Sequence, residues 1–173
     1  MSVAPVRTDA PNGPTARIAL KQSNAGGSGS FLVEADDGHR YWCKSVDNLQ
    51  GPRVPVTEQI VGRFGSLLGI ATCRVELICI PSGLAGWEFR PGAFLSEGWM
   101  HGSAAEEPVV ETHSLDRRAH DDNAVRHAGY FALYDWLFGS DPQWLVKQPS
   151  DWMYFSHDHG HYLPGNTNGL LRL

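Results

Sequence analysis

Three things are scarce in this chain of 173 residues, and each scarcity excludes a class of protein. It has only three cysteines, at positions 43, 73 and 79, and no CxxC pair, which excludes a disulfide framework and a cysteine zinc site. The 14 Lys and Arg residues are scattered and outnumbered by 19 Asp and Glu, which argues against nucleic-acid binding. No run of about 20 apolar residues occurs, so no membrane span is expected. We therefore expect a cytoplasmic protein with neither a nucleic-acid nor a membrane partner.

What is present predicts a folded α+β protein. The hydrophobic fraction of 42% is enough for a core, and 19 glycines with 11 prolines predict many turns rather than a helical bundle. Residues 31–35 and 39–44 have the composition of strands, and Asp36-Asp37-Gly38 between them is a hairpin turn. Residues 56–68 carry apolar side chains at helical spacing and are followed by Gly69, a common helix stop.

Four further elements are expected in the rest of the chain. Residues 73–81 have the pattern of a buried strand, and residues 102–118 look like a loop. A more buried helix is expected over 123–138, and short strands are expected at 144–146 and 152–155. Together these patterns suggest a flexible leader (1–16), a first lobe with a hinge (17–101) and a smaller second lobe (102–173).

Several residues of the first lobe are suited to binding a nucleotide. The Gly/Ser loop at 23–30 could bring backbone N–H groups close to phosphates, and its candidate contacts are Gly26, Gly27, Ser28, Gly29 and Ser30. Lys44, at the end of the following strand, could reach the same phosphates, and Glu58 on the next helix could hold that lysine in place. Each of these features also has a simpler explanation, such as loop flexibility or a favourable charge at a helix start.

Two carboxylates in the second lobe lie in loops that follow expected elements. Asp141 comes after the helix expected at 123–138, and Asp158 follows an aromatic strand, within His157-Asp158-His159-Gly160-His161. Magnesium prefers one or two carboxylates together with phosphate oxygens, so this pair could complete a site for magnesium and a nucleotide. Both aspartates could instead stabilise turns, with Pro142 and Gly160 respectively.

The order of these parts resembles that of kinase-fold enzymes, and in particular the HipA-like kinases of the short actinobacterial type. The resemblance spans most of residues 17–163. It depends on four segments: SNAGGSGSFLVEADDGHRYWCK (23–44), GPRVPVTEQIVGRFGSLLGI (51–70), YDWLFGSD (134–141) and HDHGHYL (157–163). The fold it implies is protein-kinase-like, with an antiparallel sheet and one helix in the first lobe and a reduced helical second lobe.

The resemblance also implies roles for residues. Lys44 would contact the phosphates of ATP with Glu58 as its helix partner, and Asp141 would position or deprotonate the acceptor hydroxyl. Asp158 would bind Mg²⁺. Residues 96–101, including Glu97, would form the hinge beside the adenine. The function implied is Mg-ATP binding with phosphorylation of a hydroxyl acceptor, such as a serine or threonine of a protein.

Two departures from the family pattern support a second interpretation. The loop after Asp141 is short, so that Gln143 is the only nearby amide that could replace the asparagine expected to hold a metal. The chain also ends soon after His161, where family members continue into further helices. The alternative is therefore a catalytically degenerate kinase-like module that binds a protein partner.

Two further hypotheses come from the same region. His157, His159 and His161 alternate, so on an extended strand all three would share one face and could bind zinc or iron. A short second lobe would leave apolar side chains of the helix at 123–138 uncovered, which predicts a homodimer or a protein partner on that helix.

Overall fold

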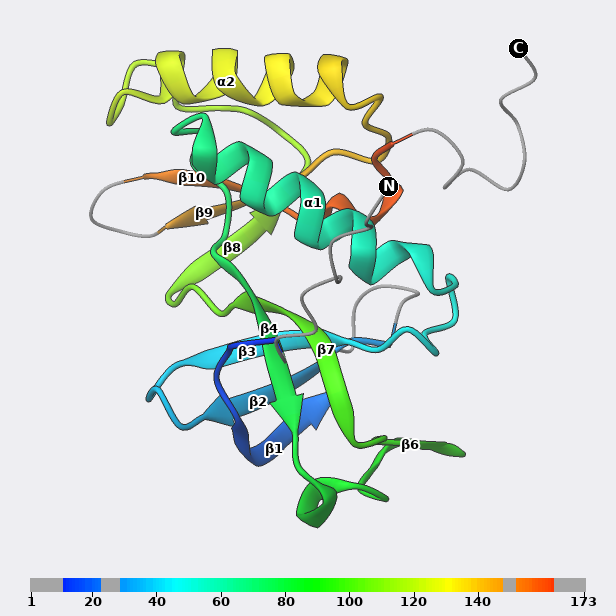
Figure 1. Ribbon diagram of the computed structural model, residues 1–173. Helices are drawn as coiled ribbons and strands as arrows, with labels where there is room; N and C mark the ends of the chain where they lie inside the picture. The colour runs from blue at the N-terminus through cyan, green and yellow to red at the C-terminus, as the bar shows by residue number, and fades with distance from the viewer. Residues whose placement is uncertain (1–10, 23–28, 148–151, 164–173) are drawn as a thin grey trace, which may run out of the picture.

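The structure is a computed structural model that describes residues 11–22, 29–147 and 152–163. Its first part is a curled five-stranded antiparallel sheet with the order β1-β2-β3-β7-β4 (Figure 1). The strands are β1 (Ala16–Gln22), β2 (Phe31–Ala35), β3 (Arg40–Lys44), β4 (Val75–Ile80) and β7 (Gly98–Ala104). The predicted hairpin is confirmed, because β2 pairs with β3 across the turn at residues 36–38.

The core of this sheet comes from side chains that alternate along the strands. Its fully buried members are Phe31, Val33, Tyr41, Cys43, Ile78 and Ile80. In β3, Tyr41 and Cys43 point into this core, so Trp42 and Lys44 lie on the opposite face of the strand.

Helix α1 (Arg53–Leu67) connects β3 to β4 and contacts both β4 and β7. It begins three residues earlier than the sequence predicted, because Pro55 falls in the first turn, where its missing N–H is not needed. Gly62 lets the helix approach the sheet closely, since a Cβ at this position would lie 2.7 Å from a methyl group of Val75.

The segment between β4 and β7 holds only small elements. They are the 3₁₀ turn η1 (Ser82–Leu84) and the two-stranded ribbon of β5 (Glu88–Arg90) and β6 (Ala93–Phe94). Because β7 runs through residues 101 and 102, the lobe boundary expected there falls inside a strand of the first sheet. The connection to the second sheet is the stretch 105–108 instead.

The second part combines a three-stranded sheet with one helix. The antiparallel sheet has the order β10-β9-β8, formed by β8 (Val109–Thr112), β9 (Gln143–Lys147) and β10 (Tyr154–His157). The expectation of a loop throughout 102–118 was therefore wrong at β8. Helix α2 (Asn123–Trp136) lies beyond α1 at the top of Figure 1, with Tyr130 and Leu133 buried beneath it. The α+β class is confirmed.

The segment just before β4 joins the first part of the molecule to the second sheet. Residues 71–73, between α1 and β4, run beside β10, with hydrogen bonds from Cys73 N to Ser156 O (3.1 Å) and from Ser156 N to Ala71 O (2.9 Å). After β10 the 3₁₀ turn η2 (His159–His161) packs against α1. No helix in the described ranges has the length and apolarity needed to cross a membrane.

Candidate active site between the two sheets

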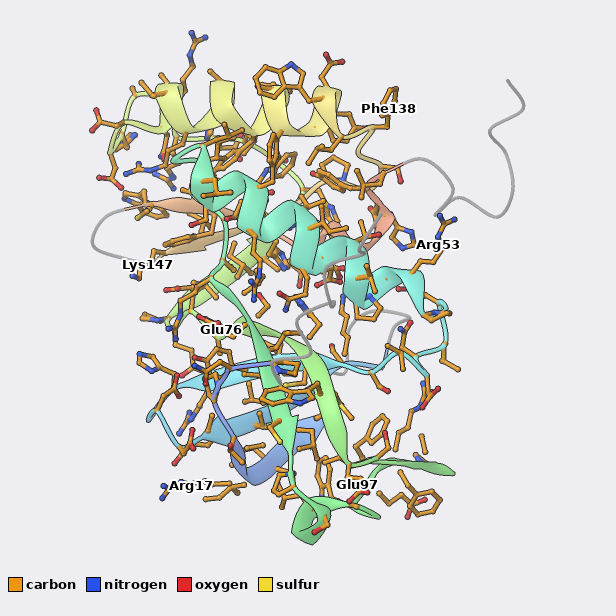
Figure 2. The ribbon with its side chains drawn as sticks, in the orientation of Figure 1. Arg17, Arg53, Glu76, Glu97, Phe138 and Lys147 are labelled. Carbon is orange, nitrogen blue, oxygen red and sulfur yellow. The ribbon has the colours of Figure 1, made fainter. Side chains whose placement is uncertain are left out.

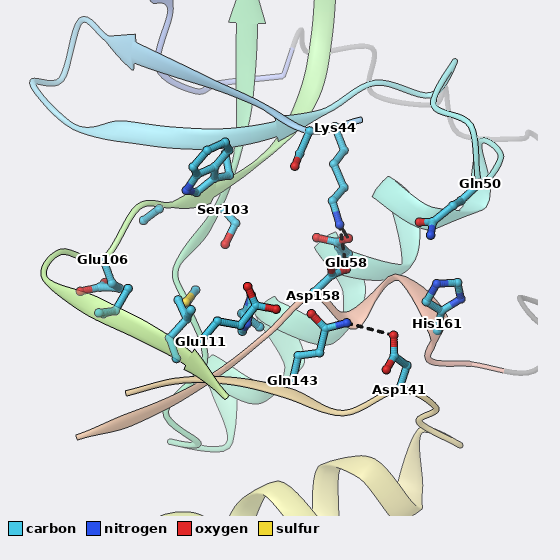
Figure 3. A pocket seen from close by; sticks show the side chains of 17 residues that line it. Lys44, Gln50, Glu58, Ser103, Glu106, Glu111, Asp141, Gln143, Asp158 and His161 are labelled. Carbon is cyan, nitrogen blue, oxygen red and sulfur yellow. Dashed lines mark hydrogen bonds and ion pairs between the residues drawn. The ribbon is translucent and has the colours of Figure 1, made fainter. Parts of the chain in front are cut away.

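A cavity of about 260 Å³ lies between the first sheet and the second (Figure 3). Strands β3 and β7 supply its upper wall, and strands β8, β9 and β10 supply its lower wall. Its lining is rich in carboxylates and includes Trp42, Lys44, Glu58, Ser103, Glu106, Glu111, Asp141, Gln143, Leu145, His157, Asp158 and His161. Residues as far apart along the chain as Lys44 and Asp158, which are 114 positions apart, therefore meet in one place.

Lys44 is the residue that links the elements around this cavity. It ends β3 and points away from the core, so its Nζ reaches Glu58 Oε1 of α1 (2.5 Å) and Asp158 Oδ1 just before η2 (2.7 Å). The side chain is only 8% exposed. An ammonium group this deeply buried requires charged partners, and it has two.

Glu58 is shared between Lys44 and a histidine of the first sheet. Its second oxygen, Oε2, lies 2.9 Å from His101 Nε2 on β7. The Gln59 amide contacts the other ring nitrogen, Nδ1, at 3.0 Å and also donates to the backbone carbonyl of Glu76. Because Nδ1 faces the Gln59 amide donor, Nε2 carries the ring proton and faces Glu58, so the glutamate lies between Lys44 and His101.

These contacts shift the pKa values of both charged partners. Burial by itself would raise the pKa of Glu58, but the adjacent Lys44 and His101 outweigh it and lower the pKa below the ordinary value. Burial likewise disfavours the charged form of Lys44, but the carboxylates of Glu58 and Asp158 raise its pKa. Both side chains are charged at neutral pH.

The turn after Asp158 depends on a glycine. At Gly160 a Cβ would lie 2.6 Å from Val54 Cγ1 and 3.1 Å from Glu58 Oε1, so any larger residue would press on the first turns of α1. The Asp158-His159-Gly160 sequence therefore fits closely under the helix that carries Glu58. This is a physical reason for glycine at position 160.

Asp141 and Gln143 lie on the lower side of the cavity, where β9 begins. Asp141 is exposed, and the Gln143 Nε2 donates to Asp141 Oδ2 at 2.9 Å (Figure 3). The preceding Ser140 donates its hydroxyl to the carbonyl of His161 at 2.8 Å, which fastens this turn to η2. The two aspartates expected from the sequence thus line the same cavity.

The oxygen atoms here have the chemistry that magnesium prefers. Asp158 uses one carboxylate oxygen for Lys44, and the amide oxygen of Gln143 is a further hard donor. In the part of the chain that the structure describes, no group of three or more His, Cys, Asp or Glu side chains is arranged to hold a metal on its own. Magnesium is usually held by one or two carboxylates plus phosphates, so this donor set fits magnesium bound with a nucleotide.

Of the other residues expected at the site, one lines the cavity. Ser30 lines the cavity, whereas Gly29 lies against the guanidinium of Arg90 with a φ of +66°. Gly26, Gly27 and Ser28 lie outside the described residues. Glu97 is exposed just before β7 begins, near the bottom of Figure 2, and does not line this cavity.

The three alternating histidines do not share one face. Residues 159–161 form the η2 turn instead of continuing the strand, because the chain leaves β10 at Asp158 with a φ of +51°. His159 is buried, its Nε2 lies 2.8 Å from Ser156 Oγ, and burial lowers its pKa to about 3. The extended arrangement that a three-histidine metal site needs is therefore not formed.

Sequence reasoning missed several lining residues. Trp42 could have been found, because strand alternation places residues 42 and 44 on one face. Ser103, Glu106 and Glu111 gave no local signal, since their place in the cavity depends on pairing between strands far apart in the sequence.

Comparison with protein-family models matches residues 17–158 to the HipA-like kinases. The match covers most of the chain, so this protein belongs to the HipA-like kinase family. Searches of curated proteins and of solved structures each gave no significant match.

Proposed function

We propose that this protein binds Mg-ATP in the cavity between its sheets and phosphorylates a hydroxyl group, such as a serine or threonine of a protein. The observation that carries the proposal is the buried contact of Lys44 with both Glu58 and Asp158 at the cavity wall. This contact joins the first sheet, α1 and the turn before η2, which are the elements that a kinase-like fold uses to position ATP.

Lys44 would orient the phosphates of ATP. The lysine already carries its charge, and Glu58, which is itself held by His101, fixes its direction, so little ordering is needed when the nucleotide binds. Asp158 and Gln143 would hold magnesium, which would neutralise the charge that develops on the phosphate oxygens.

Asp141 would act on the acceptor. The acceptor oxygen would attack the γ-phosphorus, its proton would pass to the Asp141 carboxylate, and the bond to the β–γ bridging oxygen would break to release ADP. The exposure of Asp141 supports this role, because a protein acceptor has to reach the group that takes its proton.

A second candidate is a kinase-like module that binds a protein partner without transferring phosphate. The observation that favours it is the hydrogen bond from Gln143 to Asp141, which occupies one oxygen of the carboxylate assigned to the acceptor. Among the described lining residues, Lys44 is also the single Lys or Arg side chain in a cavity with five carboxylates.

Isosteric substitutions of the two aspartates test the proposal. We expect Asp158→Asn to abolish the magnesium dependence of ATP binding, measured by calorimetry. Asp141→Asn should bind ATP normally but lower transfer of labelled γ-phosphate by at least about a hundredfold, because it removes the proton acceptor.

Asp135→Asn, an exposed change on α2, is the matched control and should behave as the unmodified protein. ATP binding without any phosphate transfer by the unmodified protein would favour the partner-binding module. Equal loss of ATP binding in both aspartate variants would contradict the division of roles.

A further inference from the structure

We infer that His161 is a second contact for the transferred phosphoryl group: its imidazole donates a hydrogen bond to an oxygen of the γ-phosphate at the end of the cavity where Asp141 lies. This inference rests on the proposed function, since it concerns the same cavity. It assigns a catalytic side chain to the turn η2, in addition to Lys44, Asp141 and Asp158.

Lys44 alone has too few donors left for the terminal phosphate. An ammonium group has three N–H donors. Two of them already face Glu58 Oε1 (2.5 Å) and Asp158 Oδ1 (2.7 Å), so one is left for ATP. Among the lining residues that the structure describes, the other charged side chains are five carboxylates, which repel a phosphate. The γ-phosphate therefore needs a further donor from the cavity wall.

Of the three alternating histidines, His161 is the one placed to supply it. His159 does not line the cavity, and His157 extends from the floor strand β10 with its Nε2 buried. His161 lines the cavity from η2, and Figure 3 shows its ring at the same end as the carboxylate of Asp141. The hydrogen bond from Ser140 Oγ to His161 O (2.8 Å) holds the two segments together.

The turn that carries His161 is fixed on both sides. It packs against α1, and the next residue, Tyr162, is buried with its ring edge to face against Tyr134 (centroids 6.0 Å apart) and His159 (5.0 Å). The ring of His161 is half-buried and, within the described residues, makes no hydrogen bond or ion pair of its own. Its N–H groups are therefore both held in place and available.

A second neutral donor lies on the other wall at this end. Gln50, in the connection between β3 and α1, lines the cavity and lies near His161 in Figure 3. Its backbone N donates to Asn48 Oδ1 (2.9 Å), and Asn48 Nδ2 donates to Gly51 O (2.9 Å), which orders this connection. An amide and an imidazole thus face a space that an anion can enter between them.

The contribution of His161 is to stabilise charge, because no bond to the imidazole forms or breaks. The acceptor oxygen takes the phosphoryl group, Asp141 takes the acceptor's proton, and ADP leaves with the electron pair of the broken bond. Meanwhile His161 donates to the phosphoryl oxygens. Imidazole has an N–H donor whether it is neutral or protonated. A donor that is already oriented stabilises the transition state without any reorganisation during the reaction.

Calorimetry with Mg-ATP and Mg-ADP tests the contact without relying on phosphate transfer. His161→Ala should weaken the binding of ATP by about tenfold, because one hydrogen bond to a charged group is lost. The affinity for ADP, which lacks the γ-phosphate, should stay within about twofold. A variant that had lost its fold would lose both nucleotides. Transfer of labelled γ-phosphate should fall by about a hundredfold.

Two amide variants test whether the donor itself is the cause. His161→Asn places its amide near the position of Nδ1, and His161→Gln places it near that of Nε2, so one of the two should restore most of the affinity for ATP. The variant that does so identifies the ring nitrogen that donates. His120→Ala, an exposed change before α2 and outside the cavity, is the matched control and should behave as the unmodified protein.

The outcomes separate this inference from the proposed function. If ATP binds with magnesium but His161→Ala leaves its affinity unchanged, weakens ADP as much as ATP, or is rescued by neither amide, the inference is wrong and the proposed function stands. If the unmodified protein binds ATP without transferring phosphate, the transfer step is wrong and the affinities for ATP and ADP alone decide the inference. If neither nucleotide binds, both are wrong.

Discussion

Buried histidines in this protein differ in whether a charged partner compensates their burial. His101 contacts Glu58, whereas His127 on α2 packs edge to face against Tyr154 with ring centroids 5.2 Å apart. Among the described residues, no hydrogen-bond partner meets the Nε2 of His127. Burial lowers the pKa of His127 first of all, and two nearby arginines lower it further, against a smaller opposite effect of Asp116. His127 is therefore neutral in the folded protein.

This burial predicts a pH dependence of stability. Between the lowered pKa of His127 in the folded chain and the ordinary histidine pKa of about 6.5, the unfolded chain binds more protons at His127 than the folded chain does. The free energy of unfolding should therefore fall as the pH falls below 6.5, by at most about 1.4 kcal/mol per pH unit from this one group. Urea unfolding between pH 7 and pH 5.5 measures it.

His127→Phe isolates the contribution of the histidine. The ring contacts can persist, while the titrating group is gone, so the variant should show a shallower pH dependence than the unmodified protein. Comparison of the two proteins at pH 8 measures any difference in packing alone. A pH dependence as steep in the variant would contradict the assignment.

At the residue scale the sequence predicted the polar side chains of the site better than the residues that hold those side chains in place. Lys44, Glu58 and Asp158 stood out because their spacing fits a known order of parts, and the structure places all three around one cavity. The contact of His101 with Glu58 could not be predicted, because it depends on β7 pairing with β3 and β4 and on α1 lying against β4 and β7.

At the scale of elements, the fit between η2 and α1 gives the next prediction. Gly160→Ala should lower the free energy of unfolding by about 1–3 kcal/mol, because the new methyl group would collide with Val54 on α1. The same group would lie next to the Glu58 carboxylate, so ATP affinity should fall as well. Thermal unfolding and calorimetry measure the two effects.

Gly83→Ala is the matched control for this change. A Cβ at Gly83 would meet no atom within 4 Å, so the substitution should leave stability and binding unchanged. A fully stable Gly160→Ala protein with normal ATP affinity would show that η2 and α1 can separate without cost.

Elements with strong local patterns were the predictable ones. The hairpin of β2 and β3 has a turn sequence and two apolar strands, and α2 has a helical repeat over four turns. Strand β8 has two polar residues among its four, and it is a strand only because β9 pairs with it from more than 30 residues away. Local sequence carries no signal for such a pairing.

At the scale of the whole molecule, the outer side of α2 is apolar. Phe131 and Trp136 on this helix and Phe138 just after it are 64%, 60% and 67% exposed. The uncovered helix predicted from the sequence is therefore present in the described part of the chain. Large apolar patches are uncommon on the free surface of a protein, and they usually mark an interface.

We expect a second copy of the chain to cover this helix. Trp136→Ser and Phe131→Ser should each weaken dimerisation by at least about tenfold, because aromatic side chains contribute much of the energy of an interface. Analytical ultracentrifugation at tens of micromolar measures the effect. Leu49→Ser, an equally exposed change before α1, is the control. A monomeric unmodified protein that binds no apolar dye would contradict the prediction.

The hydrogen bonds between residues 71–73 and Ser156 determine how the cavity can change its shape. Main-chain contacts of this kind join the two sheets along one edge, and the side chain of Cys73 lines the cavity beside them. We therefore expect the two sheets to open by rotation about that edge rather than by moving apart. Lys44 on β3 bonds to Glu58 and to Asp158, which follows β10. The contact that orients the lysine therefore also holds the two sheets together across the cavity.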